Sequence, residues 1–290
     1  MSECQRIGFI GLGAMGSLMA QHLVSVGVQV VAFDVDETKR KQFEFPAESP
    51  SDVAKNVEWI VCMLPHPDVL RDVLLGKNGI HETAKRGTIV IDMSTSGPDI
   101  DVFCAHALEP SGIELIDAPV GKGTWAAGQG ALTILAGGES GQIKRATWLL
   151  SLLGTKIIHC GPLGSGQVVK LGNNIATCAN LAAAFEAYQF ATSNGANAEA
   201  LLEVMRDTAA DSWQLNNTVP RALANDFSLG FKSSLALKDL TLTLSRAETE
   251  GLYLPCTKGA STWYQRSVDA GDGELDLGVI FKQTAQVTEY

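Results

Sequence analysis

The sequence predicts two domains: an α/β domain with a doubly wound, largely parallel sheet, and an all-helical domain after it. The first observation is that strand-like and helix-like segments alternate from residue 6 to about residue 160. The second is that only helix-like segments follow the glycine-rich stretch 161–166. A length of 290 residues also fits two domains. We expect them to span residues 1–162 and 163–290.

The expected strands are short runs of apolar and β-branched residues bounded by turn-forming residues. They cover residues 7–10, 28–33, 59–63, 88–92, 114–117, 133–136 and 156–159. Segments between them, such as 16–26 and 68–75, have the helical spacing of apolar residues. Strands connected through helices pair in parallel, which predicts the doubly wound sheet.

The second domain is expected to open with a long helix from residue 166 to about residue 194, rich in Ala and Leu. A helix that is apolar on most faces is buried, between domains or between subunits. Gly195 is suited to end it as a C-cap. Further helices are expected near residues 198–209, 235–250, 255–270 and 277–286.

The chain has a formal net charge of −10 and a pI near 5.0. An acidic surface disfavours nucleic acid and membranes as partners, and an anionic substrate would need a local basic pocket. Six cysteines are scattered without a CxxC pair, so we expect reduced thiols in a cytoplasmic protein and no metal site. No apolar run approaches ~18 residues, and the first strand starts too early for a signal peptide.

The most specific motif is GLGAMG (11–16), which follows the expected first strand and opens a helix. In a G-x-G-x-x-G turn, Gly11 permits the tight bend, Gly13 lets a pyrophosphate approach the backbone, and Gly16 allows close packing of helix and strand. The pyrophosphate would lie at the N-terminus of the helix that begins near Ala14. The motif predicts a dinucleotide cofactor.

The second strand ends at Asp34, 18 residues after Gly16. A carboxylate at about this spacing hydrogen-bonds the ribose hydroxyls and repels a 2′-phosphate. The next two residues are Val35 and Asp36, not Arg. We therefore expect NAD(H) in preference to NADP(H).

Two further strand ends carry candidate residues. DMST (92–95) places Ser94 and Thr95 beyond the carboxyl end of a strand, where ligands of open α/β sheets bind. The alternative is that these residues only cap a helix. The segment MLP (63–65) follows another strand and is expected to wall the cofactor cleft.

The segment DAPVGKGT (117–124) leaves a strand and enters a glycine-rich turn. Its backbone N–H groups could bind an anion, and Lys122 adds a positive charge in an otherwise acidic chain. The alternative is a solvated surface lysine without a ligand.

The segment GSGQVVKLGNN (164–174) opens the long helix. Lys170 shares a helix face with Asn174 and neighbours Asn173. Desolvation beside a cofactor domain favours the neutral form of a lysine and suits it to general acid–base work. The alternative is a lysine that caps the domain interface without chemistry.

Taken together, these motifs resemble those of the β-hydroxyacid dehydrogenase family over nearly the whole chain. The matching pieces are GFIGLGAMG (8–16), MLP (63–65), DMST (92–95), DAPV (117–120), GxGxxxKxxNN (164–174) and Phe231 with LKDL (237–240). The resemblance implies an N-terminal Rossmann domain and an all-helical C-terminal domain joined by a long interdomain helix. It also implies a homodimer or homotetramer, with the helical domain completing the substrate site and the subunit interface.

The resemblance implies that Lys170 is the catalytic acid/base, supported by Asn174, and that Asp239 is structural. The substrate would contact Ser94, Gly121, Lys122, Gly123, Asn173, Asn174 and Lys238. The cofactor would contact Gly11, Leu12, Gly13, Ala14, Met15, Gly16, Asp34, Met63, Leu64, Pro65, Thr95 and Lys238.

The chain departs from the family after DAPV, where most members carry Ser-Gly-Gly and this chain has Gly121, Lys122 and Gly123. A cation here resembles the sulfolactaldehyde reductase branch, in which Gly is followed by Arg. The expected activity is NAD(H)-dependent interconversion of a small acidic β-hydroxy acid and its semialdehyde, with 3-sulfolactaldehyde as the leading substrate. Tartronate, succinate and 3-hydroxyisobutyrate-type carboxylates are alternatives. Lys170 argues against the more remote alternatives, an imine reductase and a non-catalytic cofactor-binding module.

Overall fold

The computed structural model describes residues 5–228 and 230–284. The chain divides into two compact units, Met1–Lys170 and Leu171–Tyr290. The division falls within helix α8 (Ser165–Ser193), a little beyond the expected boundary at 162/163. The reason is that the first turn of α8 is hydrogen-bonded to the sheet of the first unit.

The first unit contains one sheet with the strand order β3-β2-β1-β4-β5-β6-β8-β7, and β9 pairs with β8. The strands are β1 (Arg6–Ile10), β2 (Gln29–Phe33), β3 (Phe45–Pro46), β4 (Trp59–Cys62), β5 (Ile89–Asp92), β6 (Glu114–Asp117), β7 (Val120–Gly121), β8 (Leu132–Gly137) and β9 (Gly154–Gly161). Strands β1 to β6 are parallel, whereas β8 runs antiparallel to β6 and β7. The order 3-2-1-4-5-6 is that of the Rossmann fold. The predicted doubly wound sheet is confirmed.

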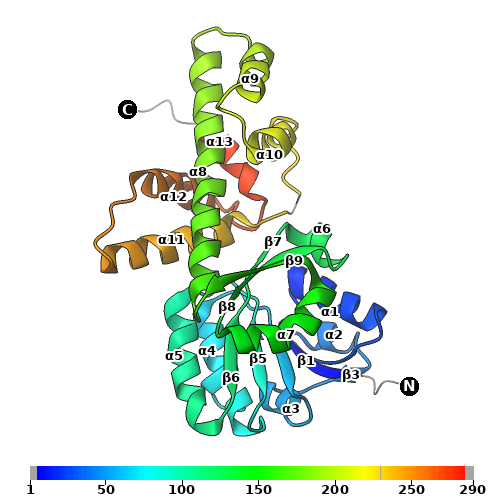
Figure 1. Cartoon of the computed structure of the whole chain (residues 1–290). Coiled ribbons are helices and arrows are strands. Elements are labelled where there is room, and N and C mark those ends of the chain that lie inside the picture. Colours follow the sequence, from blue (N-terminus) through cyan, green and yellow to red (C-terminus); the bar gives the residue numbers. More distant parts are fainter. Residues whose placement is uncertain (1–4, 229, 285–290) are drawn as a thin grey trace. The chain divides into compact units, whose positions relative to one another are not determined.

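Helices cover both faces of this sheet (Figure 1). They are α1 (Ala14–Ser25), α2 (Glu37–Arg40), α3 (Pro50–Ala54), α4 (Pro67–Leu75), α5 (Pro98–Leu108), α6 (Gly123–Ala127) and α7 (Ser140–Leu153), with 3-10 turns η1 (Ile80–Glu82) and η2 (Glu109–Ser111). Successive side chains of β1 point to opposite faces of the sheet and so enter two different cores. Phe9 packs with α1 and α7, and Ile10 packs with α3, α4 and α5. Burial on both faces explains why the strands are continuously apolar.

The second unit is helical. After α8 come α9 (Ala198–Asp207), α10 (Trp213–Leu223), α11 (Ser233–Thr249), α12 (Pro255–Asp269), the 3-10 turn η3 (Leu277–Val279) and α13 (Ile280–Thr284). Their shared core includes Phe185, Leu215, Leu240 and Tyr264. The predicted all-helical second domain with a long first helix is confirmed. In the described residues, no helix has the length and apolar character needed to cross a membrane.

Helix α10 was not expected from the sequence. It is polar on average and contains Pro220, a residue that usually ends a helix. It forms because Ser212 caps it, accepting from the N–H of Leu215 at 3.1 Å, and because Leu215 and Val219 are fully buried. The last expected helix, 277–286, appears as η3 and α13 up to Thr284, and residues 285 and 286 lie outside the described residues.

Candidate active site

The three glycines of the dinucleotide motif have different surroundings. Gly11 has φ +95°, and a Cβ there would lie 2.3 Å from the carbonyl oxygen of Met63. A Cβ on Gly16 would lie 1.9 Å from the carbonyl oxygen of Gly11. A Cβ on Gly13 would meet nothing within 4 Å. Thus Gly11 and Gly16 are required by the fold itself, and Gly13 leaves open space at the N-terminus of α1.

Asp34 lies at the carboxyl end of β2, directly beside the glycine loop. Its Oδ2 accepts from the N–H of Leu12 at 2.7 Å, and its Oδ1 accepts from the N–H of Asp36 at 2.9 Å. Sequence reasoning missed Arg40, whose Nη1 donates to the carbonyl oxygen of Asp34 at 3.2 Å. The guanidinium is also paired with Glu48 at 2.5 Å. Only the fold reveals this pairing, because α2 brings Arg40 back over the strand end.

The loops after β4 and β5 are tied together by Ser94. The side chain is 2% exposed, and its hydroxyl oxygen accepts from the N–H of Leu64 at 2.8 Å. Met63 donates its N–H to the carbonyl oxygen of Ile10 at 2.8 Å, so this loop also joins β1. Ser94 thus has a structural role within the first unit. Its contact with substrate stays a prediction, as do the cofactor contacts of half-buried Thr95 and exposed Pro65.

Two carboxyl groups are fully buried beneath these loops. Asp92 ends β5 and Asp101 lies on α5, and both accept from the hydroxyl of Ser96, at 2.5 and 3.3 Å. Burial raises the pKa of Asp92, and burial together with the Asp92 charge raises the pKa of Asp101 well above its usual range. Among the described residues, no donor reaches Oδ1 of Asp101.

Asp117 caps the N-terminus of α8 from the end of β6. Its two oxygens accept from the N–H groups of Gly164 at 2.7 Å and Gln167 at 2.8 Å. The N–H of Gln167 is a free donor of the first helical turn and that of Gly164 lies just before it, so the carboxylate also meets the positive end of the helix dipole. A Cβ on Gly166 would lie 2.6 Å from Asp117 Oδ2. The glycines of the segment 164–166 therefore let the helix start directly against the sheet.

Gln167 is the second residue that sequence reasoning missed. It is fully buried, and its Oε1 accepts from the N–H groups of Ser96 at 3.2 Å and Gly97 at 3.3 Å. Its Nε2 lies 2.9 Å from Ser96 Oγ, 3.1 Å from the carbonyl oxygen of Ser94 and 3.3 Å from Asp92 Oδ2. The sequence gives no periodic signal for such a residue, because its partners come from a distant loop.

Lys122 lies in the glycine-rich turn between β7 and α6. It is exposed, has φ +80°, and donates from Nζ to the carbonyl oxygen of Ala131 at 3.2 Å. Among the described residues the other two non-glycine residues with positive φ are Asn78 and Asn225. Asparagine tolerates this conformation and lysine does so less readily. The turn thus holds a lysine in a backbone conformation that glycine adopts more readily.

The remaining predicted residues lie on α8 and α11. Asn174, 3% exposed, donates from Nδ2 to Asp239 Oδ2 at 2.6 Å, and accepts at Oδ1 from Asn173 at 3.2 Å. Lys238 Nζ lies 3.1 Å from the other Asp239 oxygen. Asp239 therefore brings Asn174 and Lys238 together in the second unit. Lys170, the half-buried last residue of the first unit, shares the helix face of Asn174.

The predicted residues therefore form two sets. In the first unit the glycine loop, Asp34 and the loops after β4 and β5 are joined by hydrogen bonds. In the second unit, Asn174 and Lys238 contact Asp239, and Asn173 contacts Asn174. No group of His, Cys, Asp or Glu residues within 5–228 and 230–284 has the arrangement of a metal site.

Two family models match consecutive parts of the chain. Residues 6–161 match the family model described as the NAD binding domain of 6-phosphogluconate dehydrogenase. Residues 164–283 match the model described as NAD-binding of NADP-dependent 3-hydroxyisobutyrate dehydrogenase. The chain is also 36% identical to 3-sulfolactaldehyde reductase of Escherichia coli, over 96% of this chain and 95% of that protein. The chain belongs to the β-hydroxyacid dehydrogenase family.

Other members of this β-hydroxyacid dehydrogenase family are similarly close. The mitochondrial 3-hydroxyisobutyrate dehydrogenase of Rattus norvegicus is 31% identical, over 97% of this chain and 88% of its own length. The structure of Mycobacterium tuberculosis 3-hydroxyisobutyrate dehydrogenase with L-serine has a TM-score of 0.89 and 28% identity, covering 96% of this chain and 98% of that one. The protein is accordingly an NAD(P)-dependent β-hydroxyacid dehydrogenase of class EC 1.1.1.

Proposed function

We propose that this β-hydroxyacid dehydrogenase uses NAD(H) to interconvert a small acidic β-hydroxy acid and its semialdehyde, with 3-sulfolactaldehyde as the leading substrate. The observation that carries the choice of substrate is Lys122, a cation held in a left-handed turn where the family usually has glycine. The name of the Escherichia coli relative, 36% identical, supports the same choice.

The conformation of Lys122 supports a role for its charge. A non-glycine residue with positive φ costs on the order of 1 kcal/mol relative to glycine. Its bond to the carbonyl of Ala131 is exposed and returns little of that cost. A Cβ on the preceding Gly121 would only make ordinary contact with Thr133 at 3.9 Å, so serine would fit there. We infer that the Gly-Lys pair serves the recognition of a strong anion rather than the fold.

The glycine loop fits a dinucleotide, because Gly13 leaves the backbone at the N-terminus of α1 open. Asp34 supports NAD(H) over NADP(H), since its carboxylate would repel a 2′-phosphate. Arg40 is already engaged on both sides of its guanidinium, by the carbonyl oxygen of Asp34 and by Glu48.

The chemistry follows from the acid–base residues. When bound, NAD(H) supplies or accepts the hydride. In the direction of aldehyde reduction, Lys170 Nζ gives a proton to the carbonyl oxygen; in alcohol oxidation, the neutral amine takes the hydroxyl proton. Asn174 holds the same oxygen, and Asp239 fixes the orientation of its amide. Gly121, Lys122, Gly123 and Ser94 hold the acid group and so place the reacting carbon, which accounts for much of the rate gain in such reactions.

A homodimer or homotetramer is part of this proposal. Phe190 of helix α8 is 73% exposed in the single chain, and Val168 is 53% exposed. The family resemblance carries this part of the proposal, and both side chains would be available to a partner subunit. Light scattering coupled to size-exclusion chromatography tests it, and a monomer at micromolar concentration would contradict it.

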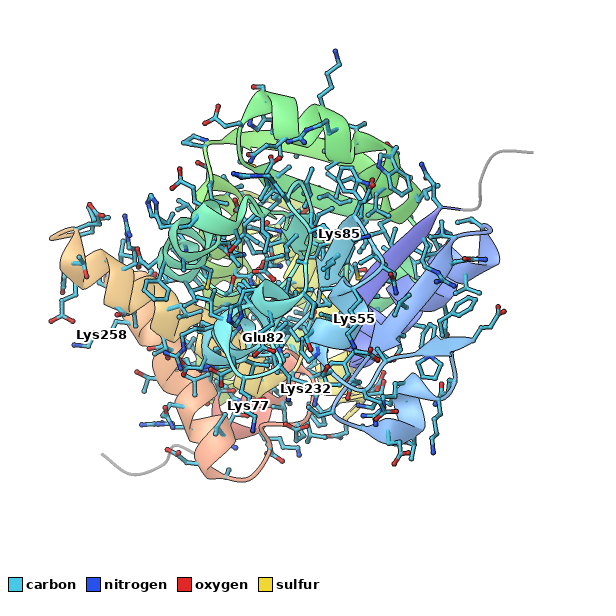
Figure 2. The ribbon with its side chains drawn as sticks, turned by 90° about the horizontal axis from the view of Figure 1, so that it is seen from below. Lys55, Lys77, Glu82, Lys85, Lys232 and Lys258 are labelled. Atoms are coloured by element: carbon cyan, nitrogen blue, oxygen red, sulfur yellow. The ribbon has the colours of Figure 1, made fainter. Side chains whose placement is uncertain are left out.

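The decisive experiment is an NADH-oxidation assay with four aldehydes: sulfolactaldehyde and the semialdehydes of tartronate, succinate and methylmalonate. Lys122→Ala should lose sulfolactaldehyde reduction by about tenfold or more, the value of one lost charge-assisted contact. Lys85→Ala is the matched control. Lys85 precedes β5 and so lies at the amino ends of the strands, the edge seen from below in Figure 2, opposite to the turn.

A second variant, Gly121→Ser with Lys122→Gly, restores the usual family turn. It should shift the preference from the sulfonate toward a carboxylate semialdehyde. A carboxylate preference in the wild type, with no effect of Lys122→Ala, would instead identify an ordinary semialdehyde reductase whose Lys122 is a surface charge.

The proposed acid/base is tested separately. Lys170→Ala should abolish turnover, by at least about a thousandfold, while NADH still binds.

A further inference from the structure

We propose that Gln167 is the positioning residue of the active site: its carboxamide fixes the first turn of α8 against the loop after β5, and thereby the placement of Lys170. This inference rests on the proposed role of Lys170 as acid/base. It adds to that role a buried residue that is expected to touch neither substrate nor cofactor.

The side chain of Gln167 joins the helix to a loop that the cofactor is expected to use. Its Oε1 accepts from the N–H groups of Ser96 and Gly97, at 3.2 and 3.3 Å. Its Nε2 donates toward Ser96 Oγ and the carbonyl oxygen of Ser94. Because the hydroxyl of Ser94 accepts from Leu64, the same amide is connected to the loop after β4.

The backbone of Gln167 is held separately, by the bond of its N–H to Asp117 at the end of β6. A single residue thus fixes α8 to two neighbouring strand ends, through its backbone and through its side chain. The backbone bond to Asp117 sets where the helix starts. The side-chain bonds set the rotation of the first turn about the helix axis.

Lys170 follows Gln167 by three residues, about 4.5 Å along the helix axis and on an adjacent part of its surface. A rotation or slip of this turn therefore moves the lysine amine relative to the loops after β4 and β5. A misplacement of ~1 Å at a reacting group can cost about a hundredfold in rate. An apolar side chain at 167 would also leave the N–H groups of Ser96 and Gly97 without their acceptor, so the loop would shift.

The test is Gln167→Met, which keeps the length of the side chain and removes its polar atoms. The matched control is Gln214→Met on α10, because Gln214 is also buried (6% exposed) and its Oε1 accepts from Thr218 at 2.5 Å. Both are assayed with the aldehyde of the four-member panel that has the highest kcat/KM in the wild type. The readouts are kcat, KM, the Kd of NADH and the kinetic isotope effect with NADH deuterated at the transferred position.

Gln167→Met should lower kcat by about ten- to a hundredfold while KM and the Kd of NADH stay within about threefold. The isotope effect on kcat should rise, because a misplaced lysine makes the chemical step slower than product release. Gln214→Met should reduce thermal stability but leave the kcat and isotope effect of the folded enzyme unchanged. A smaller fraction of folded enzyme would lower kcat without raising the isotope effect, so that pattern in Gln167→Met would overturn the proposal.

Ser96→Ala keeps the test decisive if Gln167→Met fails to fold. It removes the hydroxyl that accepts from Gln167 at 2.9 Å and donates to Asp92 at 2.5 Å, and it leaves the two backbone N–H bonds to Gln167 in place. It should produce a smaller fall in kcat with the same rise in isotope effect. Wild-type kcat and isotope effect in both variants would overturn the inference.

Lys170→Ala separates the positioning role of Gln167 from the acid/base role of Lys170. If it is inactive while Gln167→Met equals wild type, the inference alone fails; if it retains turnover, the proposed acid/base fails first.

Discussion

Asp117 and Gln167, 50 positions apart in the chain, are joined by a 2.8 Å hydrogen bond from the backbone N–H of Gln167 to Asp117 Oδ2. The carboxylate at the end of β6 thereby accepts from the N–H groups that an N-cap side chain would otherwise satisfy. Most N-caps come from the residue just before the helix. Here the cap comes from the sheet, so the start of the helix that carries Lys170 is defined by the strand and not by its own loop.

Asp117→Asn should destabilise the protein by about 1–3 kcal/mol, because one cap oxygen is replaced by an amide that faces an N–H donor. Urea unfolding at pH 7 measures the loss. Asp207→Asn, at the exposed last position of α9, is the control and should change little. Equal stability of Asp117→Asn and wild type would show that the cap contributes nothing.

Asp101→Asn should raise the stability of the protein, whereas Asp117→Asn lowers it. Burial, with the Asp92 charge, raises the pKa of Asp101 in the folded state, so the folded protein retains a proton that the unfolded chain releases. Stability contributed by this proton is present at low pH and falls as pH rises above the unfolded value, about 4. An amide donates to Asp92 at every pH and removes this dependence.

The expected result is a Tm for Asp101→Asn that exceeds wild type at pH 8 by more than it does at pH 5. Each pKa unit removed corresponds to about 1.4 kcal/mol. Thermal unfolding from pH 5 to pH 9 gives both curves. A variant curve parallel to that of wild type would mean that Asp101 is ionised in the fold.

Gly13→Ala should weaken the binding of NADH, whereas Gly16→Ala should lower the stability of the fold. At Gly16 a methyl group would meet the Gly11 carbonyl at 1.9 Å, so this variant should lose about 1–3 kcal/mol or more of stability. At Gly13 the backbone has φ −70° and open space, so alanine should fold normally. Gly13→Ala should nevertheless weaken NADH binding, because its methyl group occupies the path of the pyrophosphate. Fluorescence titration with NADH and unfolding curves measure the two effects, and normal NADH affinity in Gly13→Ala would argue against the proposed binding mode.

Asp34→Ala should raise the ratio of kcat/KM with NADPH to that with NADH by about tenfold or more, since it removes a negative charge that opposes the 2′-phosphate. Asp36→Ala, at the adjacent cap of α2, is the matched control and should leave the ratio near that of wild type. Initial rates with both reduced cofactors provide the measurement. If the two variants give the same ratio, Asp34 does not select the cofactor.

The sheet and the glycine loop could be predicted because their signals are local. Strands buried on both faces read as apolar runs, and Gly11 and Gly16 occupy positions that no other residue fits. The two-residue strands β3 and β7 and the polar helix α10 were missed, because each forms only when a neighbouring element supplies partners or a core. Arg40 and Gln167 were missed for a similar reason. Their importance lies in bonds to Glu48 and to the loop after β5, and no spacing rule predicts such pairs.

A tilt of helix α8 displaces its two ends by different amounts. Its 29 residues span about 43 Å, and its first turn is fixed to the sheet by Asp117 and Gln167. A tilt of one degree about the first turn moves the far end of the helix by about 0.7 Å. The same tilt moves Lys170, five residues from the start, by only about 0.1 Å. Lys170, the proposed acid/base, therefore lies where a tilt of the helix displaces it least.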